Sequence, residues 1–411
     1  MWLLDKILTR LVHKGQITLV EADGTCKTFG THDPDYPDLE LRLHDNKVAG
    51  QIVRDPRLGL AEAYMDGRAT IGGGDIMDLI GMIRANNKWE SGRQIEQATV
   101  LRKLKEAAIG KMRQINHRSA ARANVAHHYD LSSKLYDLFL DKERQYSCAY
   151  WTGPDKTLEE AQIDKLRHIA AKLHLQPGMK VLDIGCGWGG MALFLHRHYG
   201  VDVTGITLST EQFTMARERA EQEGVTDHVR FELIDYRDMK GQFDRIVSVG
   251  MFEHVGTPNY RDFFRMCHNL LNPEGVMLLH SIGRMGGPSS TDAFTQKYIF
   301  PGGYIPALSE IVRASEPNRL MVTDVESLRL HYARTLRAWY ERVQENQSEI
   351  EALYDARFFR MWSFYLAGAA ASFENGGLLV YQLQYARDRH TLPVTRDYMQ
   401  EAERALAVVD A

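Results

Sequence analysis

The chain has 411 residues, of which 44% are hydrophobic and 25% are charged, and its formal net charge at pH 7 is −4. This length exceeds what one hydrophobic core usually organises, so we expect two domains. The composition is that of an ordinary globular protein, and the slightly acidic balance does not indicate a nucleic-acid partner. The four cysteines lie far apart and form no CxxC pair. This pattern indicates free thiols in a reducing, cytoplasmic compartment, with neither a disulfide framework nor a metal cluster.

Residues 2–11 predict an N-terminal helix, because their apolar residues recur every three or four positions. Asp5, Lys6 and Arg10 interrupt the apolar stretch, which excludes a signal peptide. The apolar face either packs on its own domain or lies on a membrane surface, and we favour packing. No apolar run approaches the ~20 residues of a spanning helix, so we expect a cytoplasmic protein with peripheral membrane association at most.

Residues 1–95 predict a small α+β accessory domain. Strand-like alternation occurs at residues 16–24, 39–45 and 51–57, and residues 74–87 have the pattern of a helix. Nothing in this stretch resembles a nucleotide-binding loop or a catalytic cluster.

A basic segment follows, and we interpret residues 96–122 as a helical linker. Between residues 84 and 122 there are ten Lys or Arg against three Glu, a local charge of +7. Such a segment is either a solvated helix or a site of attraction to anionic lipid, at ~1 kcal/mol per Lys or Arg near a membrane. Both alternatives remain open.

Residues 123–411 predict a larger α/β domain. Strand-like segments begin at residues 180, 201, 229, 243 and 275, with helical patterns between them. Repeated βα units predict a parallel, doubly wound, Rossmann-like sheet with helices on both faces. We expect residues 320–375 to form helical insertions and residues 378–388 to form a final strand that closes the sheet.

The loop at residues 183–190 (DIGCGWGG) follows a predicted strand and opens a predicted helix. Its glycines let a ligand approach the backbone, and the helix N-terminus favours an anionic group. The loop also fits the GxGxxG pattern of dinucleotide-binding folds. However, an acid, Asp183, precedes the first glycine, and the second strand ends in Thr207 and Ser209 without the acid that holds a ribose in NAD enzymes. The pattern therefore resembles the first motif of class I methyltransferases more than a dehydrogenase.

The third predicted strand ends at Asp235. A short acid at this end of a strand is placed to accept a hydrogen bond from an adenine amino group. The alternative is that Asp235 is an ordinary helix cap.

Six segments, in this order, resemble cyclopropane-fatty-acid synthases and mycolic acid cyclopropane synthases. They are residues 124–131 (NVAHHYDL), 146–151 (YSCAYW), 205–212 (GITLSTEQ), 251–256 (MFEHVG), 279–283 (LHSIG) and 331–339 (HYARTLRAW). The resemblance covers residues 118–390. Residues 59–67 (GLAEAYMDG) also resemble the bacterial, phospholipid-acting branch of that family.

This resemblance implies that residues 123–411 form an S-adenosylmethionine-dependent methyltransferase domain. The methionine end of the cofactor would contact residues 146–147, the backbone of the glycine loop would contact its centre, residues 207–212 would contact the ribose, and residues 235–236 the adenine. The implied cofactor residues are Tyr146, Ser147, Asp183, Gly185, Cys186, Gly187, Trp188, Gly189, Thr207, Leu208, Ser209, Gln212, Asp235 and Tyr236.

The resemblance also implies a bound bicarbonate as the catalytic base. Its holders would be Cys148, Glu253, His280, Tyr332 and the backbone of Ile282, with His254 next to Glu253 in the catalytic set. His and Tyr can donate hydrogen bonds to a small oxyanion. An ionised Glu253 can only accept hydrogen bonds. It would therefore accept one from the bicarbonate hydroxyl, which would raise the basicity of the bicarbonate. Outside such a motif, a lone buried Cys or His is usually inert core.

The chemistry of the family passes through a carbocation, for which aromatic rings are suitable neighbours. Candidates for the substrate pocket are Tyr129, Phe252 and Tyr304, together with Tyr298 and Phe300, although plain core packing is the alternative for each. Many bacterial members have a cysteine after a Tyr-Leu pair near the C-terminus. Here residues 365–369 read YLAGA, so no thiol is available there for covalent catalysis.

We therefore expect cyclopropanation of the cis double bond of a phospholipid acyl chain. The expected partners are phospholipids at the membrane surface, with a preference for anionic lipids. Oligomeric state stays open, and a homodimer is compatible with the sequence. The alternatives are methyl addition to the same double bond, N-methylation of a small amine, and a non-enzymatic lipid-binding protein.

Overall fold

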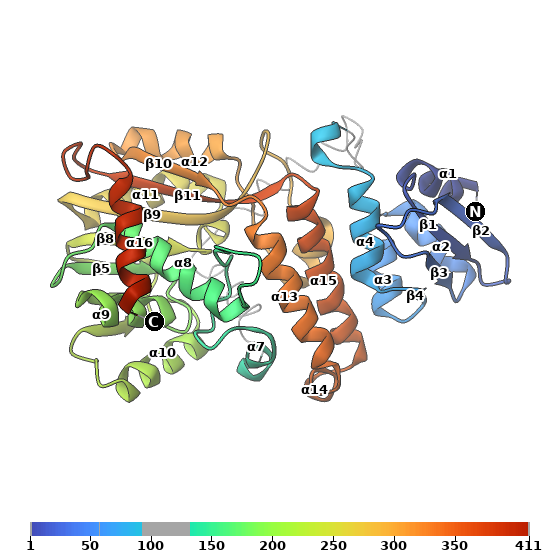
Figure 1. Cartoon of the computed structure of the whole chain (residues 1–411), viewed down its shortest axis with the longest axis horizontal. Coiled ribbons are helices and arrows are strands. Elements are labelled where there is room, and N and C mark those ends of the chain that lie inside the picture. The colour runs from blue at the N-terminus through green and yellow to red at the C-terminus, as the bar shows by residue number, and fades with distance from the viewer. Residues whose placement is uncertain (1, 57, 93–131, 410–411) are drawn as a thin grey trace. The chain divides into compact units, whose positions relative to one another are not determined.

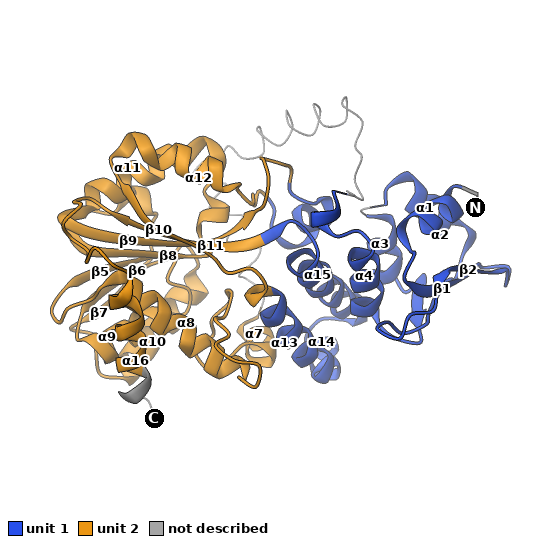
Figure 2. Cartoon of the chain, turned by 45° about the horizontal axis from the view of Figure 1, so that its top comes forward, with its two compact units in different colours: residues 1–104, 291–301, 333–378 blue, residues 105–290, 302–332, 379–411 orange. Residues whose placement is uncertain are grey.

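The computed structural model describes residues 2–56, 58–92 and 132–409. The expected basic linker (residues 96–122) and the segment that contains Tyr129 lie outside the described residues. The chain divides into two compact units (Figure 2). Unit 1 comprises residues 1–104, 291–301 and 333–378, and unit 2 comprises residues 105–290, 302–332 and 379–411.

Unit 1 contains a four-stranded sheet with the strand order β2-β1-β3-β4. Its central strands alternate buried and partly exposed residues, as expected of strands with one face on a core. The predicted N-terminal helix is confirmed as α1 (Trp2–Leu11), whose Leu4 and Leu8 are buried. The strands are β1 (Gly15–Val20), β2 (Cys26–Thr31), β3 (Leu39–Leu43) and β4 (Ala69–Gly72).

The strand expected at residues 51–57 is wrong, because α2 (Asn46–Arg54) occupies most of that range. The carboxylate of Asp45 accepts a hydrogen bond from the backbone N–H of Lys47 and caps the helix. Val48 and Ile52, one helical turn apart, are buried. The apparent alternation therefore belongs to the buried face of a helix.

The remaining helices of unit 1 come from three separate stretches of the chain. The helix expected at residues 74–87 is confirmed as α4 (Ile76–Ala85), and it packs against α15 (Ala356–Glu374). The hydroxyl of Tyr340 donates to the carboxylate of Asp75 at 2.9 Å, across 265 residues of sequence. The other helical segments are α3 (Gly59–Met65), η1 (Trp89–Ser91), η5 (Thr295–Ile299), α13 (His331–Glu345) and α14 (Gln347–Leu353).

Unit 2 contains a seven-stranded sheet with the order β10-β11-β9-β8-β5-β6-β7. The five strands β5 to β9 run parallel, and the order reverses between β5 and β8. The predicted doubly wound, Rossmann-like α/β fold is therefore confirmed. The strands are β5 (Lys180–Ile184), β6 (Asp202–Ile206), β7 (Val229–Glu232), β8 (Phe243–Val249), β9 (Leu271–Arg284), β10 (Met321–Ser327) and β11 (Leu378–Ala386).

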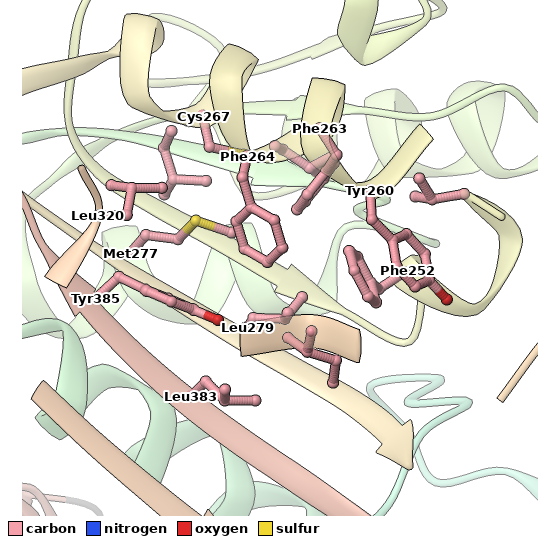
Figure 3. Close-up of a cluster of buried hydrophobic side chains, with 14 of the residues drawn as sticks. Phe252, Tyr260, Phe263, Phe264, Cys267, Met277, Leu279, Leu320, Leu383 and Tyr385 are labelled. Carbon is pink, nitrogen blue, oxygen red and sulfur yellow. The ribbon is translucent and has the colours of Figure 1, made fainter. Parts of the chain in front are cut away.

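Helices cover both faces of this sheet (Figure 2). On one face, α8 (Leu158–Leu173), α9 (Gly190–Tyr199), α10 (Thr210–Gln222) and α16 (Asp397–Val409) contribute to one buried cluster. On the other face, α11 (Tyr260–Leu270) and α12 (Leu308–Ser315) contribute to a second cluster rich in aromatic rings (Figure 3). Short segments complete the unit: α7 (Ser133–Phe139), η2 (Tyr236–Asp238), η3 (Phe252–His254), η4 (Thr257–Asn259) and η6 (Glu316–Asn318).

Two expectations for the C-terminal part need correction. Residues 320–375 were expected to form helical insertions, and most of them do, but residues 321–327 form the strand β10. The predicted last strand is confirmed as β11, yet it does not close the sheet, because β10 pairs antiparallel with its outer side. Among the described residues, no helix is long and apolar enough to cross a membrane.

Candidate active site

The carboxyl ends of β5 and β8 meet where the strand order reverses, which is where doubly wound sheets bind their ligands. The loop between β5 and α9 has left-handed backbone at Gly185, Gly187 and Gly189, with φ of 84°, 55° and 85°. A Cβ at Gly185 would lie 2.7 Å from the Cβ of Met251, which follows β8, so the two loops are in contact. A Cβ at Gly187 would meet nothing within 4 Å. The loop therefore has open space beside Gly187 for a ligand.

Two buried ionisable side chains, Asp183 just before this loop and Lys165, lie close enough to influence each other's pKa. Asp183 is 2% exposed, and its Oδ2 has no hydrogen-bond partner among the described residues. Burial raises the pKa of Asp183 to about 7, and the charge of Lys165 opposes that rise. Lys165 on α8 is fully buried, which lowers its pKa to about 8 against the opposing charges of Asp141, Cys148 and Asp183. Sequence reasoning missed Lys165.

Lys165 organises the segment expected at the methionine end of the cofactor. Its Nζ donates to Oε1 of Gln145 at 2.6 Å and to Oγ of Ser147 at 2.9 Å. Because the lysine is a donor, Ser147 keeps its own O–H for another acceptor. The ring of Tyr146 lies against Tyr136, with centroids 5.5 Å apart.

The aromatic packing around Tyr136 links this segment to the glycine loop. The centroid of the Tyr136 ring is 4.8 Å from that of Trp188, which is itself buried. Cys148 and Cys186 are also buried, and burial raises the pKa of both thiols. Neither thiol is therefore poised as a thiolate nucleophile.

The second expected cofactor segment follows β6 and forms a local network. Thr207 donates from Oγ1 to Oε1 of Gln212 at 2.9 Å, and Oγ of Ser209 accepts from the backbone N–H of Gln212 at the start of α10. Leu208 lies between them in the sequence. The structure thus brings these four predicted residues together at the carboxyl end of β6.

The third strand, β7, ends at Glu232, and Asp235 lies three residues beyond it, where it is buried and caps the short helix η2. Its carboxylate also pairs with the guanidinium of Arg237, at 2.8 Å from Nε to Oδ1 and 2.5 Å from Nη2 to Oδ2. These contacts are those of the cap alternative. They occupy both oxygens, so contact of Asp235 or the adjacent Tyr236 with adenine stays a prediction.

Glu253 lies after β8 in η3 and is 7% exposed. Its Oε1 accepts from the backbone N–H of Ile282 on β9 at 2.6 Å, so this N–H, expected to hold the bicarbonate, instead donates to Glu253. Oε2 is buried and has no hydrogen-bond partner among the described residues. Ser281 is near, but its hydroxyl donates to the carbonyl oxygen of Ile282. Burial raises the pKa of Glu253 to about 7.

The other implied catalytic residues are also buried. His280 lies opposite Val249 in the β8–β9 ladder and is 2% exposed, and burial lowers its pKa. Burial lowers the pKa of His254 to about 4, so its ring is neutral at pH 7. Tyr332 is 7% exposed at the start of α13. The neighbouring His331 accepts from the backbone N–H of Trp151 at 2.8 Å, which ties this turn to the segment that contains Cys148.

The candidate pocket aromatics separate into different environments. Phe252 stacks on Tyr260 at 4.1 Å in the core under α11 (Figure 3), which is the alternative of plain packing. Tyr304 donates from its hydroxyl to Glu310 at 2.9 Å, while its backbone N–H donates to the carbonyl oxygen of Glu253. In unit 1, the Tyr298 hydroxyl donates to Glu62 and the Phe300 ring packs on Tyr365. A role in the substrate pocket stays a prediction for each.

The fold and the glycine loop define the class of this protein, a Rossmann-like, S-adenosylmethionine-dependent methyltransferase. The loop geometry, the space beside Gly187 and the Ser147 hydroxyl are compatible with that cofactor.

Comparison with known proteins identifies the family. The model described as mycolic acid cyclopropane synthetase matches residues 116–383, and a domain of unknown function matches residues 3–91. The chain belongs to the mycolic acid cyclopropane synthetase family, which confirms the resemblance found in the sequence.

Three individual matches are informative. The chain is 41% identical over 352 residues to cyclopropane-fatty-acyl-phospholipid synthase of Escherichia coli (strain K12), covering 85% of this chain and 88% of that one. It is 37% identical over 375 residues to a probable fatty acid methyltransferase of Pseudomonas putida, covering 88% and 92%. A crystal structure of mycolic acid cyclopropane synthase CmaA1 complexed with SAH and CTAB matches with a TM-score of 0.62 and 38% identity. That match covers 64% of this chain and 98% of the other.

Proposed function

We propose that this enzyme transfers a methylene unit from S-adenosylmethionine to the cis double bond of an unsaturated phospholipid acyl chain, forming a cyclopropane ring, with bicarbonate as the base. The similarity to the Escherichia coli synthase supports the substrate class. The observation that carries the proposal is the Glu253 carboxylate, with one oxygen held by the Ile282 N–H and the other buried without a hydrogen-bond partner in the part of the chain that the structure describes.

The reaction needs a methyl donor and a base. S-adenosylmethionine would supply an electrophilic methyl group: its S–CH3 bond would break, S-adenosylhomocysteine would leave, and the methyl carbon would bond to one alkene carbon while the other became a cation. Ring closure would then require loss of a proton from the transferred methyl group, and a bicarbonate beside Glu253 would supply the base for it.

The protein's part is to hold and orient these groups in a dry site. The Ile282 N–H fixes Oε1 of Glu253, so Oε2 can accept the bicarbonate hydroxyl. Exclusion of water raises the pKa of Glu253 to about 7 and lowers the pKa of His254 to about 4. Both shifts favour the neutral form of the side chain.

The nearest alternative is methyl addition to the same double bond, and the Pseudomonas putida relative bears the name of a probable fatty acid methyltransferase. Mass spectrometry of lipids from cells that express the protein distinguishes the two. Cyclopropanation adds one CH2 and consumes the alkene, whereas a saturated methyl branch contains two further hydrogens. A branched product would contradict the proposal.

Replacement of Glu253 tests the base. Glu253→Gln keeps the shape and the bond from Ile282 but cannot ionise, so turnover should fall by ~100-fold or more while cofactor affinity changes little. Removing bicarbonate should slow the wild type reversibly and barely affect the variant. Asp244→Asn is the matched control, because Asp244 lies at the opposite end of β8 and accepts from the backbone N–H of Lys180. Near-normal turnover of Glu253→Gln on phospholipid vesicles would show that the carboxylate is structural.

We also propose that the enzyme associates peripherally with anionic membranes. The +7 segment supports this, since clustered Lys and Arg are attracted to anionic lipid surfaces.

A further inference from the structure

Helix α8 presents three basic residues, Lys165, His168 and Lys172, to the interior of unit 2. They recur at intervals of three and four residues, so they share one face, and all three are buried. Buried basic residues are rare unless they are paired, because desolvation of a charge is costly. The proposed reaction does not use Lys172 or His168, so their burial needs another explanation.

Lys172 is connected to the candidate catalytic residue His280 by hydrogen bonds through one intervening side chain, Gln382. Its Nζ donates to Oε1 of Gln382 at 2.8 Å, and Nε2 of Gln382 lies 3.2 Å from Nδ1 of His280. Gln382, on β11, is completely buried. The three side chains therefore form one short chain of hydrogen bonds from α8, through β11, to β9.

The direction of each bond in this chain follows from the chemistry of its first member. A lysine ammonium can only donate, so the Gln382 oxygen must face Lys172 and the amide nitrogen must face His280. An amide nitrogen can only donate, so Nδ1 of His280 must accept. The one proton of a neutral imidazole is then on Nε2.

We propose that Lys172 and Gln382 are positioning residues that hold His280 in its Nε2–H tautomer, so that His280 can only donate toward the oxyanion site. This inference rests on the proposed function for its catalytic meaning, but the tautomer is a property of the resting protein. The opposite tautomer would require a reversed amide, with its NH2 group facing the ammonium of Lys172.

A network of acids anchors Lys172 in this role. Lys172 also donates to the carboxylate of Glu326, which lies 2.7 Å from Nε2 of His168. Nδ1 of His168 lies 2.5 Å from Oε1 of Glu403. Burial raises the pKa of Glu326, but the bonds from His168 and Lys172 lower it to about 2. Burial lowers the pKa of Lys172, and the charge of Glu326 and its hydrogen bond oppose that fall and favour the ammonium form.

The charges of this network also act on the His280 ring. Burial lowers the pKa of His280, and the cations Lys165, Lys172 and His168 lower it further, against the opposing charge of Glu326. His280 is thus neutral, which is the state in which a tautomer is defined.

Nitrogen NMR of the full-length protein, labelled with 15N-histidine, tests the tautomer directly. Long-range 1H–15N spectra distinguish a protonated ring nitrogen from a bare one, and a His280→Asn variant assigns the signal. We expect a bare Nδ1 and a protonated Nε2 in the wild type. A proton on Nδ1 of wild-type His280 would overturn the proposal, with no variant needed.

Gln382→Glu should then reverse the tautomer, because a carboxylate that accepts from Lys172 must also accept from Nδ1–H. Gln384→Glu is the matched control. Gln384 is two residues along β11 and equally buried, but it bonds to Tyr398 and to the Lys172 carbonyl oxygen instead of His280. An unchanged tautomer in Gln382→Glu, or the same change in Gln384→Glu, would overturn the proposal.

Kinetics separate this inference from the proposed function. With the tautomer reversed, we expect kcat of Gln382→Glu to fall by ~100-fold, as when a positioned proton donor is lost, with KM for S-adenosylmethionine nearly unchanged. If the tautomer is reversed but turnover is normal, the result would support control of the tautomer by Lys172 and Gln382. It would contradict the role of His280 in the proposed oxyanion site.

Discussion

At the scale of single residues, the carboxyl group of Glu253 couples stability to pH. Burial raises its pKa in the folded state from 4.5 to about 7. The folded state then keeps a proton that the unfolded chain loses, so the contribution of Glu253 to stability falls as pH rises from about 4.5 through about 7. At ~1.4 kcal/mol per pKa unit, Glu253→Gln should be more stable than the wild type at pH 8, by up to about 3 kcal/mol.

Urea denaturation at pH 5 and pH 8 measures this effect. The difference in unfolding free energy between variant and wild type should be larger at pH 8. An equal difference at both pH values would mean that Glu253 does not titrate in this range.

Lys165 should contribute to recognition of the amino-acid end of the cofactor. Lys165→Met removes the donor to Ser147 and Gln145. Hydrogen bonds from charged groups contribute about 1.5–3 kcal/mol, so affinity for S-adenosylhomocysteine should fall by ~10-fold or more. Calorimetric titration should show little change for methylthioadenosine, which lacks the amino-acid end. Equal losses for both ligands would indicate general disruption of the fold.

Gly187→Val should abolish cofactor binding. The residue has φ of 55° and faces open space, so a side chain would be strained and would occupy the space proposed for the cofactor. Gly178→Val is the matched control, since Gly178 also has a positive φ, 79°, and nothing within 4 Å of an added Cβ. A folded Gly187→Val with wild-type affinity in calorimetry would contradict the assignment of the loop.

At the scale of elements, the junction of β9 and β11 depends on one close approach. A Cβ at Gly283 would lie 2.3 Å from Cδ2 of Tyr381. Gly283→Ala should therefore destabilise unit 2 by about 1–3 kcal/mol, the range for overpacking a core. Gly287→Ala, where an added Cβ meets nothing within 4 Å, should be nearly neutral. Equal urea midpoints for the two variants would show that the Tyr381 ring moves aside at little cost.

The sequence predicted most elements around the glycine loop, because their periodicity is local and strong. It was wrong at residues 51–57, where a short apolar spacing fits both a strand and one helical face, and the Asp45 cap favours the helix. It missed β10, whose residues are largely exposed or partly buried, as is common for an edge strand.

At the scale of the whole molecule, the basic segment provides a test of membrane association. Replacing Arg102, Lys103, Lys105 and Lys111 by Glu should weaken binding to anionic vesicles, with ~1 kcal/mol lost for each cation near the surface. The wild-type interaction should also weaken as salt is added. Neutral vesicles are the control. Unchanged sedimentation with anionic vesicles would mean that the segment is only a solvated linker.

The division of the chain differs from the contiguous domains expected at residues 1–95 and 123–411. Unit 1 also includes residues 291–301 and 333–378. The reason lies in the packing of α15, which lies against α3 and α4 of the N-terminal part. An amphipathic pattern shows that a helix has a buried face, but it does not show which elements cover that face.

The sequence by itself determined the class of fold, the family and most of the candidate site, because strand periodicity, the glycine loop and the ordered motifs are local features of the chain. Only the tertiary structure decided how Lys165, Lys172 and Gln382 are used. Lys172 and Gln382 are 210 residues apart, and Gln382 and His280 are 102 apart. No local pattern specifies such pairs, since hydrogen bonds between buried side chains depend on the three-dimensional packing of α8, β9 and β11.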